Sequence, residues 1–374
     1  MEQLTYTGPG SAEQLPDVLK KWAPEKILLV RGKNSYTKCG AANIMERSKE
    51  VLACQLTEFC EFSENPQYED VKKGLTLVRQ FQPDVIIGIG GGSVMDMAKL
   101  LRFFYSYDYN EDFSRFDKKE GIIPLVVLPT TSGTGSESTH FAVVYRNKVK
   151  YSVAHADVLP DVAVADPRFT YSNPAYLTAC SGFDALAQAV EAFWNVNATD
   201  ESDRYACRAI PLLRSNLLAG VNHPSDEVRN KLSEGAFWAG KAINITKTTA
   251  PHAFSYPFTA YYGLPHGHAV AVTFPFFLQY NYPGPEKRLN PKLDASGYKE
   301  KMDKLYAMLN VNSVVTAFDD MTGFIRQLSL GFKCPENYAP QIILEHVNLQ
   351  RLSNNPVIPD RELIRDFIFS LKTI

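Results

Sequence analysis

Three of the chain's seven histidines, His252, His266 and His268, lie in one short stretch, "PHAFSYPFTAYYGLPHGH". Imidazole is the commonest side chain among transition-metal ligands, so histidines gathered in this way suggest a metal site. A single histidine in an apolar stretch is more commonly a hydrogen-bonded core residue. The metal hypothesis therefore needs further ligands, held on a rigid element.

The segment "FDALAQAVEAFW" supplies such ligands, because Asp184 and Gln188 are four residues apart and would project from one face of a helix. Glu191 lies near the same face. A buried carboxylate requires a partner, and a cation is one that would stabilise Asp184. Together with two histidines, these residues suit Fe²⁺, Zn²⁺ or Mn²⁺. His268, two residues from His266, is better placed to support a ligand than to bind the metal itself.

A glycine-rich turn, "GIGGGSVMDMAK" (Gly88 to Lys99), indicates a second kind of chemistry. It begins where an apolar strand pattern ends and a helical pattern starts. Glycines let the backbone approach a ligand closely, and the N–H groups at a helix N-terminus attract an anion such as a pyrophosphate. The turn has neither the usual G-x-G-x-x-G spacing nor the G-K-[ST] of a P-loop. The polar turn "PTTSGTGSEST" (Pro129 to Thr139) follows another strand, and we expect it to form a second wall of a nucleotide site.

These turns require parallel strands and helices to position them, and the first half of the chain has both patterns. Four apolar runs read as buried strands: Lys26 to Val30, Asp84 to Gly90, Ile123 to Pro129, and Asp161 to Asp166. Helical patterns, such as Tyr68 to Phe81, lie between them. This alternation predicts an α/β domain with a parallel sheet.

Beyond Tyr171 the patterns are mostly helical, so we place a domain boundary near residue 178. Residues 1–178 are expected to form the α/β dinucleotide-binding domain. Residues 179–374 are expected to form an α-helical metal and substrate domain.

The composition is that of an ordinary globular protein. With 39 Lys and Arg against 41 Asp and Glu, the net charge is −2, so we expect neither nucleic acid nor a membrane as a partner. The six cysteines are scattered, which indicates reduced thiols in a cytoplasmic protein. No signal peptide pattern and no apolar run of membrane-spanning length is visible.

Taken in order, "GGGSVMDMAK", "LPTTSGTGSE", "LPDVAVADP", "SGFDALAQAVEAF" and "PHGHAVAVTFP" resemble the motifs of the iron-containing, or group III, alcohol dehydrogenases. The resemblance covers nearly the whole chain. It implies a dehydroquinate synthase-like fold, in which an N-terminal α/β domain binds a nicotinamide dinucleotide. It also implies a helical C-terminal domain that holds one divalent metal, in the cleft between the two domains.

The resemblance assigns roles to individual residues. The residues that match its cofactor site are Gly32, Gly90, Gly91, Gly92, Ser93, Asp96, Thr130, Thr131, Ser132, Thr134 and Lys150. Those that match its metal site are Asp184, His252 and His266, with Gln188 where a ligating histidine is common. Tyr256 stands where relatives often have a histidine near the substrate, and it is our candidate proton donor. His268 is the second candidate catalytic residue.

The nucleotide preference depends on the residue after the first strand. An aspartate there would accept a hydrogen bond from the ribose 2′-hydroxyl, but this chain has Gly32. Arg31, Lys33, Ser35 and Lys38 lie nearby, and cations could pair with a 2′-phosphate. We therefore favour NADPH over NADH.

The substrate is expected to be a small aldehyde, because the implied reaction is metal-assisted hydride transfer to a carbonyl. Lys241 and Lys247 precede His252 and suit an anionic aldehyde, and Asn195 is a further candidate. The runs "EAFWNVNATDESDRYA" and "PHAFSYPFTAYYGLPHGHAVAVT" most resemble the branch that reduces phosphonoacetaldehyde to 2-hydroxyethylphosphonate, a step of phosphonate metabolism.

Three alternatives stay open. The chain could be a dehydrogenase for an ordinary alcohol, diol or glycerol, or a lyase like dehydroquinate synthase, or a nucleotide-binding protein without activity. Three candidate metal ligands argue against the last of these. We expect a homodimer or a higher homo-oligomer.

Overall fold

The computed structural model describes residues 3–147, 149–284 and 288–371, and the chain divides into two units, 1–173 and 174–374. The first unit is built on a six-stranded parallel sheet with the order β1-β10-β7-β4-β2-β3. Its strands are β1 (Leu4–Thr7), β2 (Lys26–Arg31), β3 (Gln55–Phe59), β4 (Val85–Gly90), β7 (Leu125–Pro129) and β10 (Val162–Ala165).

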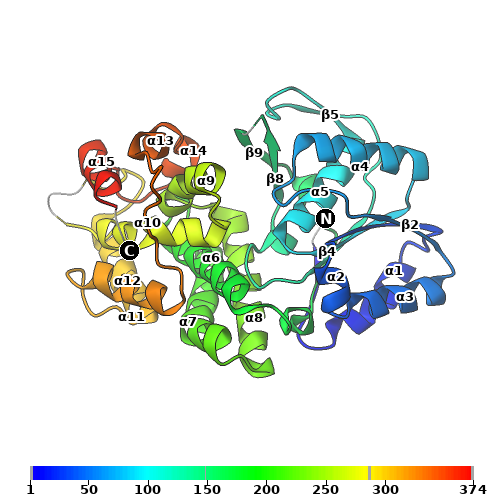
Figure 1. The fold of residues 1–374 in the computed structure, drawn as a ribbon, viewed down its shortest axis with the longest axis horizontal. Helices are drawn as coiled ribbons and strands as arrows, with labels where there is room; N and C mark the ends of the chain where they lie inside the picture. Colours follow the sequence, from blue (N-terminus) through cyan, green and yellow to red (C-terminus); the bar gives the residue numbers. More distant parts are fainter. Residues whose placement is uncertain (1–2, 148, 285–287, 372–374) are drawn as a thin grey trace. The chain divides into compact units, whose positions relative to one another are not determined.

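Helices cover both faces of this sheet (Figure 1). They are α1 (Leu15–Lys20), α2 (Ser35–Lys38), α3 (Ala41–Leu52), α4 (Tyr68–Phe81) and α5 (Gly92–Ser106). Strand β4 shows why its sequence is continuously apolar. Ile86 packs in the cluster with α4 and α5, whereas Ile87 packs in the opposite cluster with α1 and α3. Successive side chains point to opposite faces, so a strand covered on both sides must be apolar at every position.

The first unit also contains two antiparallel pairs. One joins β5 (Tyr107–Tyr109) to β6 (Phe116–Lys118), and the other joins β8 (Phe141–Arg146) to β9 (Val149–Ala154). Short 3₁₀ helices complete the unit at Ser11–Gln14, Ser136–Ser138, Ala156–Val158 and Pro167–Thr170.

In the second unit, the described residues outside the loops form helices. These are α6 (Ala175–Trp194), α7 (Asp200–Asn222), α8 (Asp226–Thr246), α9 (Ala250–Tyr262), α10 (His266–Tyr280), α11 (Ala295–Leu309), α12 (Ala317–Gln327), α13 (Pro340–Glu345), α14 (Leu349–Leu352) and α15 (Arg361–Ser370). A parallel α/β first part and a helical second part confirm the fold class expected from the sequence.

Helix α6 is the centre of the second unit. Residues 182–194 are all buried, and α7, α8 and α10 pack against them. Small residues allow this close packing: a Cβ atom at Gly182 would meet the Leu217 side chain of α7 at 2.3 Å. A helix that is enclosed on all sides exposes none of its polar residues to bulk water, so each must find a partner within the protein or in a ligand.

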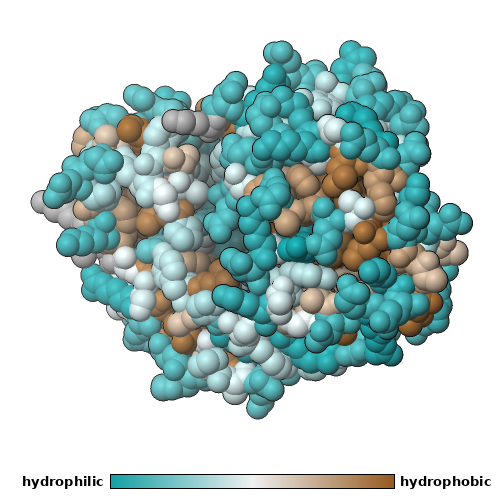
Figure 2. Space-filling view, turned by 45° about the vertical axis from the view of Figure 1, so that its right-hand side comes forward, coloured by the Kyte–Doolittle hydropathy of each residue, from teal (hydrophilic) through white to brown (hydrophobic). Residues whose placement is uncertain are grey.

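Polar residues predominate on the face shown in Figure 2, with apolar patches between them. The most exposed large apolar side chains, Val315 and Leu349, come from separate segments. Scattered apolar exposure of this kind is usual for a folded domain. Within the described part of the chain, no helix is both long enough and apolar enough to cross a membrane.

Candidate functional site

Four buried polar residues form a stripe along α6. Asp184, Gln188, Glu191 and Asn195 follow one another at intervals of four, three and four residues, which places them on one face of the helix. The segment from Lys247 to His252 runs along this stripe. The Asn195 side chain donates to the Lys247 carbonyl at 3.2 Å, and the His252 N–H donates to Glu191 Oε1 at 3.1 Å.

The start of α10 is pressed against the backbone of α6. A Cβ atom at position 267 would lie 1.9 Å from the Cys180 carbonyl oxygen, so only glycine fits between His266 and His268. The same contact brings this turn against Asp184, because the Cβ atom added at position 267 would also lie 3.0 Å from Asp184 Cβ. Glycine in the "PHGH" motif therefore has a packing reason, and the packing places His266 beside the acidic residue of α6.

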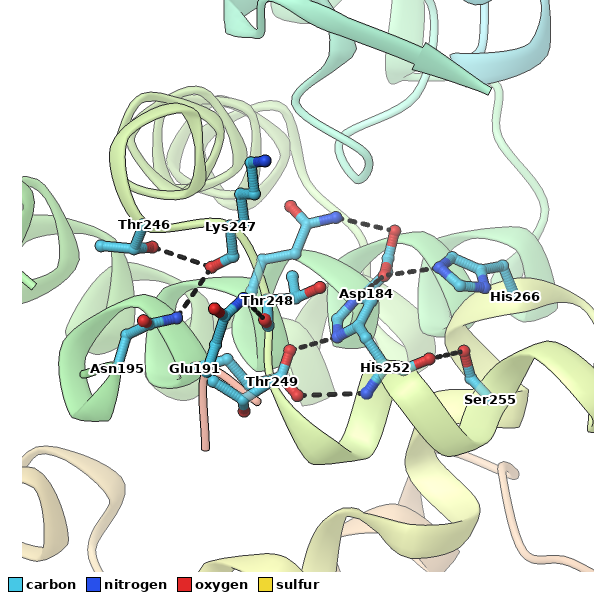
Figure 3. A network of polar contacts seen from close by, with 12 residues as sticks. Asp184, Glu191, Asn195, Thr246, Lys247, Thr248, Thr249, His252, Ser255 and His266 are labelled. Carbon is cyan, nitrogen blue, oxygen red and sulfur yellow. Dashed lines mark hydrogen bonds and ion pairs between the residues drawn. The ribbon is translucent and has the colours of Figure 1, made fainter. Parts of the chain in front are cut away.

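Asp184, His252 and His266 converge on one point (Figure 3). Each offers a ligand atom, and these atoms all lie within 4.8 Å of one another. Asp184 Oδ1 lies 3.1 Å from His252 Nε2 and 4.0 Å from His266 Nε2. The first two residues are buried, and the His266 side chain is 29% exposed. Three ligands with one accessible side are the pattern of a metal centre that accepts a further ligand.

Gln188 supplies a second reason to expect a cation here. The residue is 4% exposed and its side chain donates to Asp184 Oδ2 at 3.1 Å, while its Oε1 has no hydrogen-bond partner among the described residues. A half-turn of the amide exchanges the two atoms and presents oxygen to the cluster. A carboxylate, two imidazoles and an amide oxygen suit Fe²⁺, Zn²⁺ or Mn²⁺, so these residues fit a divalent metal.

Glu191 lies behind the cluster and contacts His252 Nδ1. Burial opposes protonation of His252, but the carboxylates of Glu191 and Asp184 outweigh it and raise the pKa of His252 to about 10. Two buried carboxylates thus attract positive charge to this imidazole, and a metal cation satisfies them as a proton does. The sequence places Glu191 near the ligand face but does not reveal this contact, because the contact depends on how α9 packs on α6.

The two predicted nucleotide turns are neighbours in the first unit. Gly90 pairs with Pro129, and the Thr130 N–H donates to the Gly90 carbonyl at 2.9 Å. A Cβ atom at Gly92 would lie 2.6 Å from the Thr134 side chain, so glycine is needed where the turns meet. The first backbone bonds of α5 run from Val94 and Met95 to Gly91, so the helix begins directly at the glycine turn, and a helix N-terminus attracts anions.

Asp96 lies beneath these turns and is fully engaged with protein groups. Its Oδ1 accepts from the Ser136 hydroxyl at 2.6 Å, and its Oδ2 accepts from the Val143 N–H at 3.0 Å. The carboxylate thereby joins α5 to the second turn and to β8.

Lys99, one helical turn after Asp96, is completely buried. Its ammonium lies 2.8 Å from Ser136 Oγ, 3.1 Å from Thr139 Oγ1 and 3.0 Å from the Phe141 carbonyl oxygen. The sequence carries a signal for this residue, because Lys99 stands one turn after an aspartate in a largely apolar helix.

The segment after β2 joins the same edge of the sheet, since the Gly32 N–H donates to the Ile89 carbonyl at 3.2 Å. A Cβ atom at Gly32 would lie 2.3 Å from Ser35 Oγ. The nearby cations have partners that the sequence did not reveal: Arg31 pairs with Glu58 at 2.7 Å, and Lys33 pairs with Glu61 at 3.1 Å.

The two candidate catalytic residues have different surroundings. The Tyr256 ring lies beside His266, with 6.1 Å between ring centroids. His268 is turned away, because two residues in a helix correspond to about 200° of rotation. Its Nδ1 lies 2.9 Å from the Tyr176 hydroxyl, and burial lowers its pKa.

The remaining predicted residues occupy separate places. Lys150 is on β9 of the first unit. Lys241 is inside α8, with its ammonium 5.6 Å from the Phe237 ring, whereas Lys247 caps the end of that helix. The Asn195 amide oxygen accepts from the Asn197 N–H at 2.9 Å. This side chain therefore stabilises the local turn and also binds the Lys247 carbonyl.

Comparison with known proteins places both halves of the chain in one family. Residues 3–167 match the family described as iron-containing alcohol dehydrogenase, and residues 178–341 match the C-terminal part of the Fe-containing alcohol dehydrogenase family. Long-chain-alcohol dehydrogenase 1 of Geobacillus thermodenitrificans is 29% identical over 95% of this chain and 91% of its own length. NADPH-dependent butanol dehydrogenase of Clostridium saccharobutylicum is 32% identical over 74% of this chain and 72% of its own length.

A solved structure extends the similarity to the fold. Sulfoacetaldehyde reductase from Bifidobacterium kashiwanohense, in complex with NAD⁺, is 26% identical and has a TM-score of 0.76, covering 99% of this chain and 96% of that one. The chain therefore belongs to the iron-containing alcohol dehydrogenase family, and it is an oxidoreductase that links alcohol and aldehyde to NAD(P) with the help of a divalent metal.

Proposed function

We propose that this enzyme reduces a small aldehyde to the primary alcohol with NADPH or NADH, and that phosphonoacetaldehyde is the substrate it reduces best. The observation that carries the proposal is the convergence of Asp184, His252 and His266, beside an oxygen of Gln188 that no described residue hydrogen-bonds. The reaction consumes the aldehyde, one NAD(P)H and one proton, and yields the alcohol and NAD(P)⁺.

Asp184, His252 and His266 are the residues that would hold the metal, with Gln188 as a weaker fourth ligand. When bound, the metal supplies Lewis acidity toward the carbonyl oxygen, and the nicotinamide supplies the hydride. Glu191 holds the His252 ring so that its Nε2 faces Asp184.

Tyr256 is our candidate for the proton that reaches the substrate oxygen. Its ring lies beside that of His266, which is the partly exposed member of the cluster. A phenol can relay a proton when it is hydrogen-bonded to the reacting oxygen or to a water. We assign His268 a supporting part, since its ring contacts Tyr176.

Two considerations support phosphonoacetaldehyde. The runs around Asn195 and around His252 resemble the branch that acts on it. The relative named sulfoacetaldehyde reductase acts, by its name, on an aldehyde with an anionic sulfonate. In phosphonoacetaldehyde, a phosphonate group occupies the position of that sulfonate. The competing proposal, an ordinary alcohol, diol or glycerol dehydrogenase, rests on the relatives named for long-chain alcohols and butanol.

For the nucleotide, we propose NADPH. Gly32 leaves no carboxylate at the place where one would accept from the ribose 2′-hydroxyl, and the relative from Clostridium saccharobutylicum is named as NADPH-dependent. The pairing of Arg31 with Glu58 weakens the argument from nearby cations. The ratio of kcat/KM for NADPH and NADH measures this preference, and a clear preference for NADH would overturn it.

An aldehyde panel tests the proposed function. The purified, metal-loaded enzyme is given NADPH with phosphonoacetaldehyde, sulfoacetaldehyde, glyceraldehyde, butanal or no aldehyde, and nucleotide oxidation is followed. We expect net oxidation with aldehydes, and a kcat/KM for phosphonoacetaldehyde above that for butanal. Net consumption of nucleotide also separates a reductase from a dehydroquinate synthase-like lyase, which regenerates its cofactor. Equal turnover of all aldehydes would defeat the phosphonate assignment, and no turnover would defeat the reductase assignment for these substrates.

A further inference from the structure

Lys247 has a backbone conformation that lysine rarely adopts. It follows the last residue of α8 with φ +63° and ψ −170°. This region of backbone space is essentially reserved for glycine, because a Cβ atom makes it strained. A lysine held there is strained in a way that glycine would not be, and such strain persists only when the surroundings impose it.

Hydrogen bonds on Lys247 and its neighbours hold the backbone in this conformation. Its carbonyl oxygen lies 3.2 Å from Asn195 Nδ2 and 2.8 Å from the Thr246 hydroxyl. The next two residues are also tied: the Thr248 carbonyl accepts from the Asn354 amide at 3.0 Å, and the Thr249 hydroxyl accepts from Trp194 Nε1 at 2.9 Å. These hydrogen bonds fix the backbone of residues 246–249 and so hold the Lys247 side chain in place.

The side chain that this segment holds is a cation. It is half-buried, and no carboxylate in residues 3–147, 149–284 or 288–371 forms an ion pair with it. Burial lowers the pKa of Lys247, and the positive charge of Arg351 lowers it further. By contrast Lys231, on the surface of the same helix, pairs with Glu227 at 2.7 Å. Two cations that lie close together in a partly desolvated position favour the binding of an anion between them or beside them.

Segment 246–249 lies beside the end of α6, the helix that carries Asp184 and Gln188. Asn195, which holds Lys247, is seven residues from Gln188 on the polar stripe of α6, or about 10 Å along the helix. Figure 3 shows the Lys247 side chain running away from Asn195. An ammonium on a lysine stem reaches roughly 6 Å from its Cα, estimated from the bond lengths of an extended chain. These two lengths suit a small substrate that has one end at the metal ligands and the other end at Lys247.

We propose that Lys247 is a specificity-determining residue that binds the anionic group of the aldehyde substrate, and that the chain retains its strained backbone for this purpose. This proposal rests on the proposed function and adds the substrate class, an aldehyde bearing a phosphonate, sulfonate or carboxylate. Asn195 is a positioning residue in this arrangement, because it acts through the Lys247 backbone.

The first test removes the charge and keeps the Cβ atom. Lys247→Met is compared with the parent enzyme on phosphonoacetaldehyde and on its uncharged dimethyl ester, with Lys231→Met as the matched control. We expect kcat/KM for the anionic aldehyde to fall by about 100-fold, with the loss of one desolvated charge pair, and that for the ester to change by less than about threefold. A dissociation constant for methylphosphonate, measured by calorimetry on the metal-loaded enzyme, should rise with the same variant.

The second test removes the strain as well as the charge. Lys247→Gly should have a Tm equal to or above that of the parent, because glycine adopts this conformation freely, and yet should lose the preference for the anionic aldehyde. A glycine variant that keeps the preference would overturn the proposal, as would a Lys247→Met variant whose losses on ester and anion are equal.

These results separate this proposal from the proposed function. If the parent enzyme reduces the dimethyl ester and phosphonoacetaldehyde with equal kcat/KM, Lys247 does not select an anion, but the reductase assignment stands. If the parent oxidises no NADPH with either compound while methylphosphonate binding depends on Lys247, the anion site stands and the reductase assignment falls.

Discussion

Two buried polar clusters, one in each unit, differ in how they are satisfied. In the first unit, the Ser136 hydroxyl donates to Asp96 and accepts from the Lys99 ammonium, and both carboxylate oxygens of Asp96 accept from protein donors. In the second unit, a carboxylate and two imidazoles converge, and the oxygen of Gln188 beside them has no hydrogen-bond partner in the described part of the chain.

The difference indicates what each cluster is for. Buried polar groups cost free energy unless they are paired, so a closed network stabilises the shape of the chain around it. The first cluster joins α5 to the second turn and thereby shapes the turns that we assign to the nucleotide. An open cluster requires a group from outside, and the second cluster therefore indicates a ligand. The following variants test this distinction.

The largest effect is expected from His266→Ala. This change removes one of three converging ligands, so we expect loss of the bound metal and a fall in kcat/KM of about 10³-fold or more. The side chain is 29% exposed, and the circular dichroism spectrum should be unchanged. Metal content by mass spectrometry accompanies the kinetics. A variant that is active without metal would contradict the assignment of this cluster.

Glu191→Gln should weaken the metal site without destroying it. The residue contacts His252 Nδ1, and loss of such a supporting carboxylate lowers metal affinity by about 10- to 100-fold. Activity should return at high metal concentration, since the three ligands remain. Glu201→Gln, on the surface of α7, is the control. Equal metal dissociation constants for parent and Glu191→Gln would refute the supporting role.

Lys99→Met should weaken nucleotide binding and leave metal binding unchanged. Loss of the three contacts that hold Ser136, Thr139 and Phe141 loosens the second turn, so we expect KM for the nucleotide to rise by about tenfold. Metal content should equal that of the parent. A variant in which metal content falls while KM for the nucleotide is unchanged would contradict the separate roles assigned to the two clusters.

The smallest expected effect is a pH dependence of stability from the same lysine. Burial lowers the pKa of Lys99 to about 8, although Asp96 and Glu137 oppose the shift. An unfolded chain keeps the lysine proton up to a pKa of about 10.4. Between these values the folded chain binds fewer protons than the unfolded chain, so the contribution of this group to stability rises with pH.

The difference in Tm between the parent and Lys99→Met should therefore shift in favour of the parent as the pH rises from about 7.5 to about 9.5. Calorimetric scans at several pH values measure this shift. A difference that stays constant, or that shifts in favour of the variant, would mean that Lys99 carries no depressed pKa in the folded chain.

Much of the fold could be predicted because the buried strands are apolar at every position. The four predicted strands match β2, β4, β7 and β10 within about two residues, a usual precision for element boundaries. The edge strands β1 and β3 were not predicted. Their residues are mostly exposed or half-buried, so their pattern is weakly apolar.

Helices α9 and α10 were also beyond prediction from local pattern. Each contains an internal proline, Pro257 and Pro275, which removes a helix hydrogen bond and normally argues against a helix. Packing of α10 against α6, and of α9 against α10, outweighs that local cost. The same packing joins Asp184 of one helix to His252 and His266 of two others.

By itself, the sequence determined which side chains were available: a carboxylate and an amide one turn apart, histidines flanking a glycine, and glycines where strands meet helices. Those properties are local, because spacing along a helix or strand decides which residues share a face. Only the tertiary structure decided which groups are satisfied and which are not. It paired Asp96 with Ser136 and Val143, left the oxygen of Gln188 without a hydrogen-bond partner among the described residues, and held Lys247 in a glycine-like conformation. Such outcomes depend on contacts between residues far apart in the chain, and no local pattern encodes them.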